Sequence, residues 1–316
     1  MKAYEKVLEL SQKIQKTLPT LIGRSCVYVD LPYYANVGDV LIWEGTEAFL
    51  KKNHIKVVYS GSWDTFDFRP LPKDVPIVMQ GGGNFGDVWE PPQQFRLKVI
   101  KHYPHNKIII LPQTIFYESK ERMKVDAKVF AQHPNLIICA RDMVSFKLAK
   151  KNFANEVLCL PDMAFCIPLD KINKYAKLEK KDSKLFIKRR DKEYKPFDIG
   201  GLVPNDAEER DWPPLENERE YLNMMHYLIR KRHWLSYLGL SRMPDWYARH
   251  ILKPRIVRIG IEFLSQYENV FSTRLHVAIL SVLLNKPCTF LDNSYGKNVS
   301  FYQTWLSDVD GLVFHL

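Results

Sequence analysis

The sequence predicts an α/β protein built on two doubly wound parallel sheets. Short β-rich runs alternate with helical patterns in the first half of the chain, and the same alternation returns after a lysine-rich stretch at 169–183. Such alternation is typical of parallel sheets covered by helices. The chain has 316 residues, 46% of them hydrophobic, and one core rarely grows beyond roughly 250–300 residues, so we expect two domains.

The first half is predicted to hold most of the strands. An amphipathic helix is expected over 1–18, and further helices over 40–52 and 142–151, because their apolar residues recur at helical spacing. Six strands are predicted, at 27–29, 56–59, 76–79, 107–111, 136–139 and 156–160.

The second half repeats the theme after a predicted linker at 169–183. We place the domains at 1–172 and 173–316, and expect helices over 218–267 with interruptions near Gly239 and Pro244. Ser272 and Thr273 provide an N-cap signal for a helix over 274–284. Strands are predicted at 184–188, 268–271 and 287–291, and a loop at 196–217.

Composition excludes several classes of protein. No apolar run approaches the ~20 residues that cross a bilayer, and the N-terminus does not resemble a signal peptide. The five cysteines are scattered without a CxxC pair, and no His/Cys cluster has zinc spacing, so we expect reduced thiols, no metal site and a cytoplasmic location. The formal net charge of +10 is compatible with solubility alone or with an anionic partner.

Polar motifs follow several predicted strands. In parallel α/β sheets, ligands bind beyond the carboxyl ends of the strands, so these motifs are expected to border a cleft. They fall at 36–39, 81–87, 112–114, 140–142 and 161–162.

The glycine-rich segment 81–87 is predicted to be a loop that lines this cleft. Glycines allow positive φ and close backbone approach to a ligand, although a tight structural turn would use them too. Its end, Asn84-Phe85-Gly86-Asp87, repeats the pattern of Asn36-Val37-Gly38-Asp39. Helix capping explains one such motif; two of them favour a site in which Asp39 or Asp87 acts as a general base or binds a hydroxyl group.

Two cationic motifs follow strands of the second half. Arg274-Leu275-His276 opens a predicted helix, whose free N–H groups suit an anion, and His276 there can act as a general acid. Arg189 and Arg190 follow the strand at 184–188, and arginine binds phosphate or carboxylate in bidentate fashion. The alternatives are a core histidine and a solvated charge run.

Together these motifs resemble the polysaccharide pyruvyltransferase family. The resemblance runs from about residue 27 to 305 and keeps the order of the motifs. It rests on Asn36-Val37-Gly38-Asp39, Gly81-Gly82-Gly83-Asn84-Phe85-Gly86-Asp87, Leu111-Pro112-Gln113-Thr114, Arg189-Arg190-Asp191-Lys192-Glu193, Thr273-Arg274-Leu275-His276 and Leu291-Asp292-Asn293-Ser294-Tyr295-Gly296-Lys297.

The resemblance implies a GT-B-like fold of two Rossmann-like domains with the active site in the interdomain cleft. It also implies transfer of pyruvate from phosphoenolpyruvate onto two hydroxyls of a sugar, giving a cyclic ketal in a cell-surface polysaccharide precursor. The N-terminal domain would then face the acceptor and the C-terminal domain the phosphoenolpyruvate, which is a donor substrate; no cofactor is expected.

The expected site combines these motifs. The expected catalytic residues are His276, Asp39 and Asp87. The expected substrate-binding residues are Arg189, Arg190, Arg274, Leu275, Asn36, Gly82, Gly83, Asn84, Gln113, Asn293 and Lys297.

The segment 221–258 departs from the family pattern. It holds eight Lys/Arg residues and one acid, a net charge of +7, interspersed with Trp and Tyr. Interfacial helices combine these residues in the same way, which suggests docking to an anionic membrane and a lipid-linked glycan acceptor. A groove for single-stranded nucleic acid is disfavoured, since no nucleic-acid-binding fold accompanies it; an ordinary solvated helical face is the simplest alternative.

Two other functions are compatible with the same sequence features. A GT-B-type glycosyltransferase that uses a nucleotide sugar would have the same fold. A non-catalytic scaffold of polysaccharide assembly would keep the fold but not the need for Arg189, Arg190 and His276.

Overall fold

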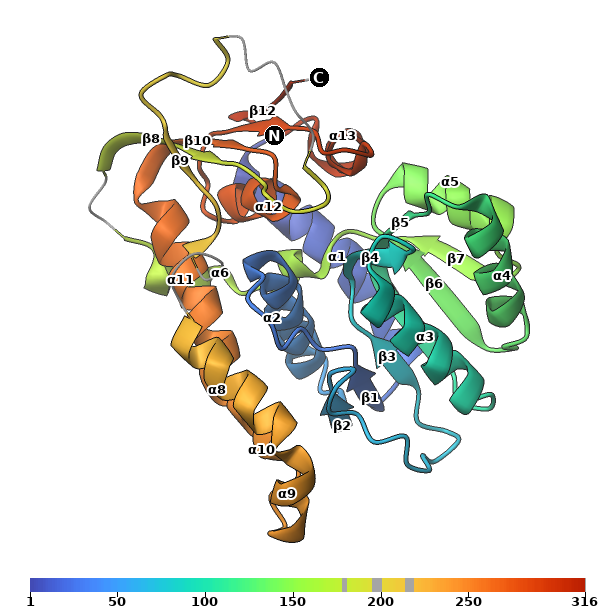
Figure 1. Cartoon of the computed structure of the whole chain (residues 1–316). Helices are drawn as coiled ribbons and strands as arrows, with labels where there is room; N and C mark the ends of the chain where they lie inside the picture. The colour runs from blue at the N-terminus through green and yellow to red at the C-terminus, as the bar shows by residue number, and fades with distance from the viewer. Residues whose placement is uncertain (178–180, 195–200, 214–218, 316) are drawn as a thin grey trace.

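The chain forms two parallel β-sheets, each flanked by helices (Figure 1). The computed structural model describes residues 1–177, 181–194, 201–213 and 219–315. The predicted α/β class and the parallel pairing are confirmed, because every strand pair in both sheets is parallel.

The N-terminal sheet has the strand order β2-β1-β3-β5-β6-β7, with β4 paired to β5. Its strands are β1 (Ser25–Val29), β2 (Lys56–Gly61), β3 (Ile77–Met79), β4 (Gly82–Gly86), β5 (Ile108–Phe116), β6 (Leu136–Ala140) and β7 (Glu156–Cys159). Its helices are α1 (Ala3–Ile22), α2 (Val37–Lys52), α3 (Glu90–His102), α4 (Lys120–Ala131) and α5 (Met143–Asn152), followed by the 3-10 turn η1 (Met163–Cys166).

The C-terminal sheet has the order β12-β11-β10-β8-β9. Its strands are β8 (Lys181–Ile187), β9 (Glu208–Arg210), β10 (Tyr267–Ser272), β11 (Cys288–Leu291) and β12 (Leu312–His315). The helices of this half are α6 (Leu169–Tyr175), α8 (Arg219–Arg230), α9 (Arg232–Tyr237), α10 (Met243–Tyr247), α11 (Lys253–Ser265), α12 (Leu275–Leu283) and α13 (Lys297–Phe301), with π-helical turns η2 (Ala248–Leu252) and η3 (Tyr302–Leu306).

In each sheet the strand order reverses at one point, and candidate site motifs lie at both points. In the N-terminal sheet, β2 lies on one side of β1 and β3 on the other, so the order reverses between β1 and β3. In the C-terminal sheet, β9 lies on one side of β8 and β10 on the other, so the order reverses between β8 and β10. Crevices that bind ligands open beyond the carboxyl ends of the strands at such points. The motifs around Asn36, Gly82, Arg189 and Arg274 therefore follow the strands at which the order reverses.

The hydrophobic core is continuous across the two sheets. One cluster joins Tyr28 of β1 and Trp43 of α2 with Leu185 of β8 and Ile279 of α12, while Val27 of β1 belongs to a second cluster. Neighbouring residues of β1 alternate between the clusters because side chains of a strand point to opposite faces. Helix α1 contacts α12 and η1, so the first helix of the chain also packs against the C-terminal half (Figure 1).

Several local predictions are wrong. The glycine-rich segment is the strand β4 and not a loop: Gly82, Phe85 and Gly86 pair with β5, and a side chain at Gly86 would approach the Phe116 carbonyl oxygen to 1.7 Å. The predicted linker at 169–183 contains α6 and the start of β8, so the proposed boundary between 172 and 173 falls inside a helix. The division into two domains itself stays a prediction. Part of the predicted loop at 196–217 lies outside the described residues, and the described part contains β9.

The start of α12 also differs from the prediction. Arg274 is the N-cap and its side chain makes no capping bond. The Ser272 hydroxyl instead accepts a hydrogen bond from the Arg274 amide at 2.9 Å, and the Thr273 hydroxyl accepts one from the Arg189 amide at 3.0 Å. The two hydroxyls thus fix the backbone of both arginine motifs.

The five cysteines are free thiols, as predicted. Burial raises the pKa of Cys26, Cys139 and Cys288 to about 12, so these thiols are held in their neutral form. Within the described residues, no helix combines the length and the apolar character needed to span a bilayer.

The contact between α2 and η1 gives a test of the fold. A side chain at Gly45 would lie 2.0 Å from the Met163 carbonyl oxygen. Gly45→Ala should therefore lower the free energy of unfolding by about 1–3 kcal/mol, although alanine is the better helix former by about 1 kcal/mol. Urea unfolding measures the change, with Lys51→Ala on the exposed face of α2 as the control. A more stable Gly45→Ala variant would contradict the described packing.

Candidate active site

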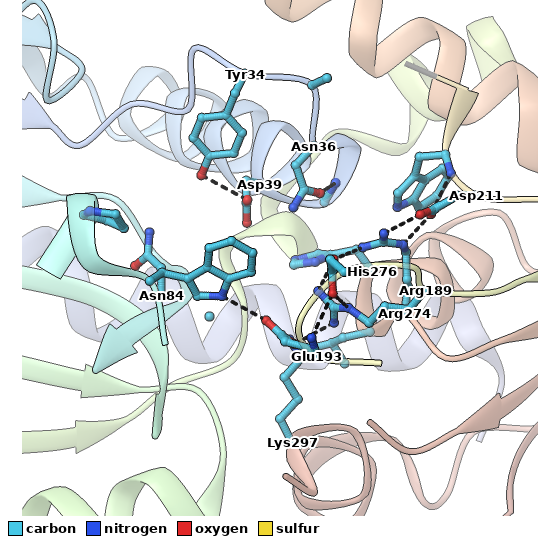
Figure 2. A pocket seen from close by; sticks show the side chains of 18 of the residues that line it. Tyr34, Asn36, Asp39, Asn84, Arg189, Glu193, Asp211, Arg274, His276 and Lys297 are labelled. Atoms are coloured by element: carbon cyan, nitrogen blue, oxygen red, sulfur yellow. Dashed lines mark hydrogen bonds and ion pairs between the residues drawn. The ribbon is translucent and has the colours of Figure 1, made fainter. Parts of the chain in front are cut away.

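A cavity of about 660 Å³ lies where the carboxyl ends of the two sheets meet. Figure 2 shows Tyr34, Asp39 and Asn84, which come from the N-terminal half, facing the arginine motifs of the C-terminal half. The cavity is lined by Tyr34, Ala35, Asn36, Gly38, Asp39, Trp63, Gly83, Asn84, Trp89, Pro91, Pro92, Arg141, Arg189, Arg190, Asp191, Glu193, Asp211, Trp212, Arg274, Leu275, His276 and Lys297.

Arg189 and Arg274 form the cationic wall of the cavity. Arg274 makes a bidentate ion pair with Asp211, at 2.5 and 2.6 Å. Arg189 contacts Asp191 at 2.7 Å through Nε and Glu193 at 2.6 Å through Nη1. Because these carboxylates, which also line the cavity, pair with the two buried guanidinium groups, the groups are fixed before any ligand binds.

His276 faces a buried ion pair. Its Nε2 lies 3.4 Å from Asp162 Oδ2 without forming a hydrogen bond, and Arg141 Nη1 lies 2.8 Å from the same oxygen. Burial alone would raise the pKa of Asp162, but the charges of His276 and Arg141 hold that pKa at about 2. Asp162 is therefore a fixed negative charge beside the His276 ring.

Gly38 makes room for this histidine. A side chain at Gly38 would lie 2.5 Å from His276 Nδ1. The glycine in Asn36-Val37-Gly38-Asp39 thus allows close packing between α2 and α12. Asn36 is the N-cap of α2, as the capping interpretation predicted, and its side chain accepts a hydrogen bond from the Gly38 amide at 3.0 Å.

Lys297 and Glu193 form a second buried ion pair at the cavity. Trp89 Nε1 and Asn293 Nδ2 each donate to Glu193 at 3.2 Å, and Asn293 Oδ1 accepts from the Lys297 amide at 2.9 Å. Burial and the neighbouring Arg189 lower the pKa of Lys297 to about 7, against the opposing effect of Glu193. Lys297 and Arg189 in turn hold the pKa of Glu193 at about 2, although burial acts in the opposite direction.

The wall from the N-terminal half is aromatic and carries one carboxylate. The Tyr34 hydroxyl donates to Asp39 at 3.0 Å, and the Tyr34 ring stacks on Trp63 with ring centres 5.4 Å apart. Burial raises the pKa of Asp39, while nearby His276 opposes this change. An aromatic platform beside a carboxylate is a surface that can hold a sugar ring and a hydroxyl group.

Four predicted binding residues lie on or beneath β4. Gly83 lines the cavity, and a side chain there would lie 2.9 Å from Arg141 Nη2. Gln113 is buried below; its Nε2 donates to Asn84 Oδ1 at 3.2 Å and its Oε1 accepts from the Asn84 amide at 3.3 Å. Gln113 thus orients Asn84, which does line the cavity. Gly82 has a φ of 141°, and a side chain there would meet Asp39 Oδ1 at 3.5 Å.

The structure does not bring every predicted residue to the cavity. Asp87 accepts hydrogen bonds from the amides of Glu118 and Ser119 at 2.8 and 2.9 Å, so its carboxylate fixes the approach to α4. Of the predicted residues, Asp87, Gly82, Gln113 and Asn293 are not among the lining residues, whereas Arg190 and Leu275 are.

Sequence reasoning assigned no role to several lining residues. Arg141 lines the cavity, and its buried partner Asp162 lies behind it. They follow β6 and β7, the strand ends at which polar motifs were expected, and this position was the available signal. Asp191 and Glu193 belong to the motif at 189–193, in which only the two arginines were assigned a role. No quoted motif contains the remaining lining residues Asp211, Tyr34, Trp63, Trp89 and Trp212. Within the described residues, no group of three or more His, Cys, Asp or Glu side chains could hold a metal ion.

The fold and the cavity define an α/β protein of the Rossmann-like class with a cation-lined ligand site. Comparison with known proteins makes this specific. The model of the family "Polysaccharide pyruvyl transferase" matches residues 36–295. The chain belongs to the polysaccharide pyruvyl transferase family and is an enzyme that transfers pyruvate onto polysaccharide.

Individual relatives agree with this family. The chain is 35% identical to the "Putative pyruvyl transferase EpsO" of Bacillus subtilis (strain 168), over 98% of this chain and 94% of that protein. It is 27% identical to "Pyruvyl transferase 1" of Schizosaccharomyces pombe, over 88% of this chain and 69% of that protein. A crystal structure of a functionally uncharacterized Klebsiella pneumoniae protein matches 97% of this chain and 98% of that one, with a TM-score of 0.65 and 21% identity, which shows a shared fold.

The low pKa values give a test of the buried carboxylates. Asp162 has a folded pKa of about 2, below the usual value of about 3.9. The stability that it contributes is present above about pH 4 and is lost as the pH falls through about 2. In Asp162→Asn, the fall in unfolding free energy between these pH values should shrink by about 2 kcal/mol.

Chemical unfolding at a series of pH values measures this difference. Asp74→Asn, an exposed position, is the control and should follow the wild type. Identical pH profiles for Asp162→Asn and the wild type would mean that Asp162 carries no stabilised negative charge.

Proposed function

We propose that this enzyme takes pyruvate from phosphoenolpyruvate and attaches it to two hydroxyls of one sugar in a cell-surface polysaccharide precursor, forming a cyclic ketal. The observation that carries this proposal is the position of His276 beside Asp162, between a cationic wall and an aromatic wall of one cavity. No cofactor is part of the proposal, because phosphoenolpyruvate is itself the donor substrate.

The cationic wall suits the donor. Phosphoenolpyruvate carries a phosphate and a carboxylate, and needs two anchors with different positions. Arg189 and Arg274 follow adjacent strands, and Lys297 and Arg190 add cations at the same cavity. Asp191, Glu193 and Asp211 already hold the buried cations. The donor would share these cations with the carboxylates, with little rearrangement of the side chains.

His276 is our candidate for the general acid. When His276 protonates the donor methylene carbon, a methyl group and an oxocarbenium-like centre at C2 result. The Asp162 carboxylate lies 3.4 Å from the His276 ring. A sugar hydroxyl adds to C2, phosphate leaves, and a second hydroxyl closes the ketal. Of the two hydroxyl protons, one replaces the proton given to the methylene carbon and the other leaves with the phosphate.

The aromatic wall suits the acceptor. Tyr34, Trp63 and Trp89 offer flat surfaces for sugar rings. Asp39, whose pKa is raised by burial, is the candidate to orient or deprotonate an acceptor hydroxyl. We further propose that the acceptor is lipid-linked, which would place the enzyme in the cytoplasm at the inner face of the membrane.

The alternative is a glycosyltransferase that uses a nucleotide sugar. Family membership does not favour it. Ligand-induced thermal stabilisation separates the two: phosphoenolpyruvate should raise the melting temperature of the wild type, and Arg189→Ala should lose most of this increase. Stabilisation by nucleotide sugars, with none by phosphoenolpyruvate, would favour the alternative.

The catalytic proposal has a direct test. His276→Ala should lower kcat/KM by about 100-fold or more, because it removes the proton donor, and Arg189→Ala should raise the KM for phosphoenolpyruvate. Mass spectrometry of a lipid-linked glycan after incubation with donor follows the gain of one pyruvate. His105→Ala and Arg24→Ala, both exposed, are the matched controls. Full turnover in both site variants, with folding verified, would rule out the mechanism.

A further inference from the structure

A helical arm, residues 219–252, connects to the C-terminal sheet but extends away from it. Its elements are α8, α9, α10 and η2. Figure 1 shows the arm running beside α2 toward the end of the molecule where β2 lies, with α9 farthest from the C-terminal sheet. We call residues 232–240, which comprise α9 and the turn after it, the arm tip.

Exposed apolar side chains gather on this arm. Eight of the seventeen large hydrophobic side chains found exposed in the described part of the chain lie between residues 224 and 251, a density that random scatter does not explain. At the arm tip, Trp234 is 59% exposed, Tyr237 76%, Leu238 56% and Leu240 42%. Leu235 alone turns inward there.

The arm's positive charge is smaller than the sequence implied. Most of the basic residues in 221–258 are paired with carboxylates, several of which come from distant parts of the chain. These pairs are Arg232 with Asp67, Arg242 with Asp245, Arg249 with Glu47, Lys253 with Glu44 and Glu47, and Arg258 with Glu262. Arg230 and Lys231 are exposed at the junction of α8 and α9, immediately before the arm tip.

The arm is attached to the chain segments that carry Tyr34 and Trp63 of the aromatic wall. Arg232, at the start of α9, forms an ion pair with Asp67. Asp245 of α10 is buried and accepts hydrogen bonds from Tyr33 at 2.9 Å and Thr65 at 2.6 Å. Tyr33 and Thr65 are close in sequence to Tyr34 and Trp63, the stacked pair that lines the cavity.

We propose that the arm tip docks on an anionic lipid bilayer, with Trp234, Tyr237 and Leu238 in the headgroup region and Arg230 and Lys231 at the phosphates. Trp and Tyr favour the membrane–water interface, while Leu adds apolar burial and the cations add attraction to anionic lipid. The bilayer would then lie next to the aromatic wall of the cavity. That this delivers a lipid-linked acceptor rests on the function proposed above; the docking itself does not.

Vesicle flotation of the full chain tests the docking. We expect the wild type to float with vesicles of phosphatidylcholine and phosphatidylglycerol, and more weakly with phosphatidylcholine alone. The triple variant Trp234→Ser, Tyr237→Ser, Leu238→Ser should bind at least about tenfold more weakly. The matched control is Tyr4→Ser, Leu8→Ser, which removes exposed apolar side chains from α1 and should float like the wild type.

The charge contribution is measured separately. Arg230→Gln with Lys231→Gln should weaken binding to the anionic vesicles by about fivefold for each cation removed. Lys51→Gln with Lys52→Gln, an exposed pair at the end of α2, should leave it unchanged.

Several outcomes would overturn the proposal. They are a wild type that stays unbound, a triple variant that floats normally, or equal binding to neutral and anionic vesicles. If the protein does not bind vesicles, two other results would assign the surface to a different partner. Loss of a dimer in solution in the triple variant would assign it to a second copy of the chain. Loss of binding to a single-stranded oligonucleotide would assign it to nucleic acid. Turnover of a water-soluble acceptor separates the two proposals: flotation without phosphoenolpyruvate turnover refutes the function alone, and turnover without flotation refutes the docking alone.

Discussion

His276 lies against the first turn of α2, where Gly38 leaves space for the imidazole ring. This contact joins the crevice at the carboxyl ends of one sheet to that of the other. One residue away, Val37 contacts Gly260 of α11 in the same manner, since a side chain at Gly260 would lie 2.5 Å from Val37. Two glycines, one on each side, therefore let α2 approach α12 and α11 closely enough for a single cavity to form.

The charges around the cavity are arranged in pairs before any ligand is present. Asp211, Asp191, Glu193 and Asp162 each hold a cation of the site, and the low pKa values of Glu193 and Asp162 show that these carboxylates stay ionised. Burying charges costs stability unless they are paired. The pairing therefore lets the fold keep several buried cations close together at one cavity.

Much of the fold could be predicted from the sequence because its signals are local. Apolar runs such as 108–111 and 136–139 indicate buried strands. The polar motifs that follow these runs lie at the cavity edge, because the carboxyl ends of parallel strands meet at one edge of a sheet. Strand β4 was missed because glycines carry no side-chain pattern; its pairing with β5 defines it. Gly83 and Asn84 of this segment line the cavity, as predicted for 81–87, whereas the predicted loop conformation is wrong.

Residues of the candidate site could be predicted only where they follow the end of a strand. Asp39 and Asp87 belong to matching tetrapeptides, yet Asp39 opens a helix at the cavity while Asp87 binds the amides before α4. Sequence cannot separate them, because the difference lies in what packs beside each. The charge of 221–258 was overestimated for the same reason: Glu44, Glu47 and Asp67, which neutralise much of it, lie more than a hundred residues earlier.

The place of the helical arm in the chain has a consequence for the evolution of this enzyme. The arm lies wholly within the connection between β9 and β10, so its length and surface can vary while the strand order of the C-terminal sheet stays the same. The arginine motifs are attached to β8 and β10 themselves. Variation in this one connection can therefore change the exposed surface of the arm without moving the arginine motifs at the cavity.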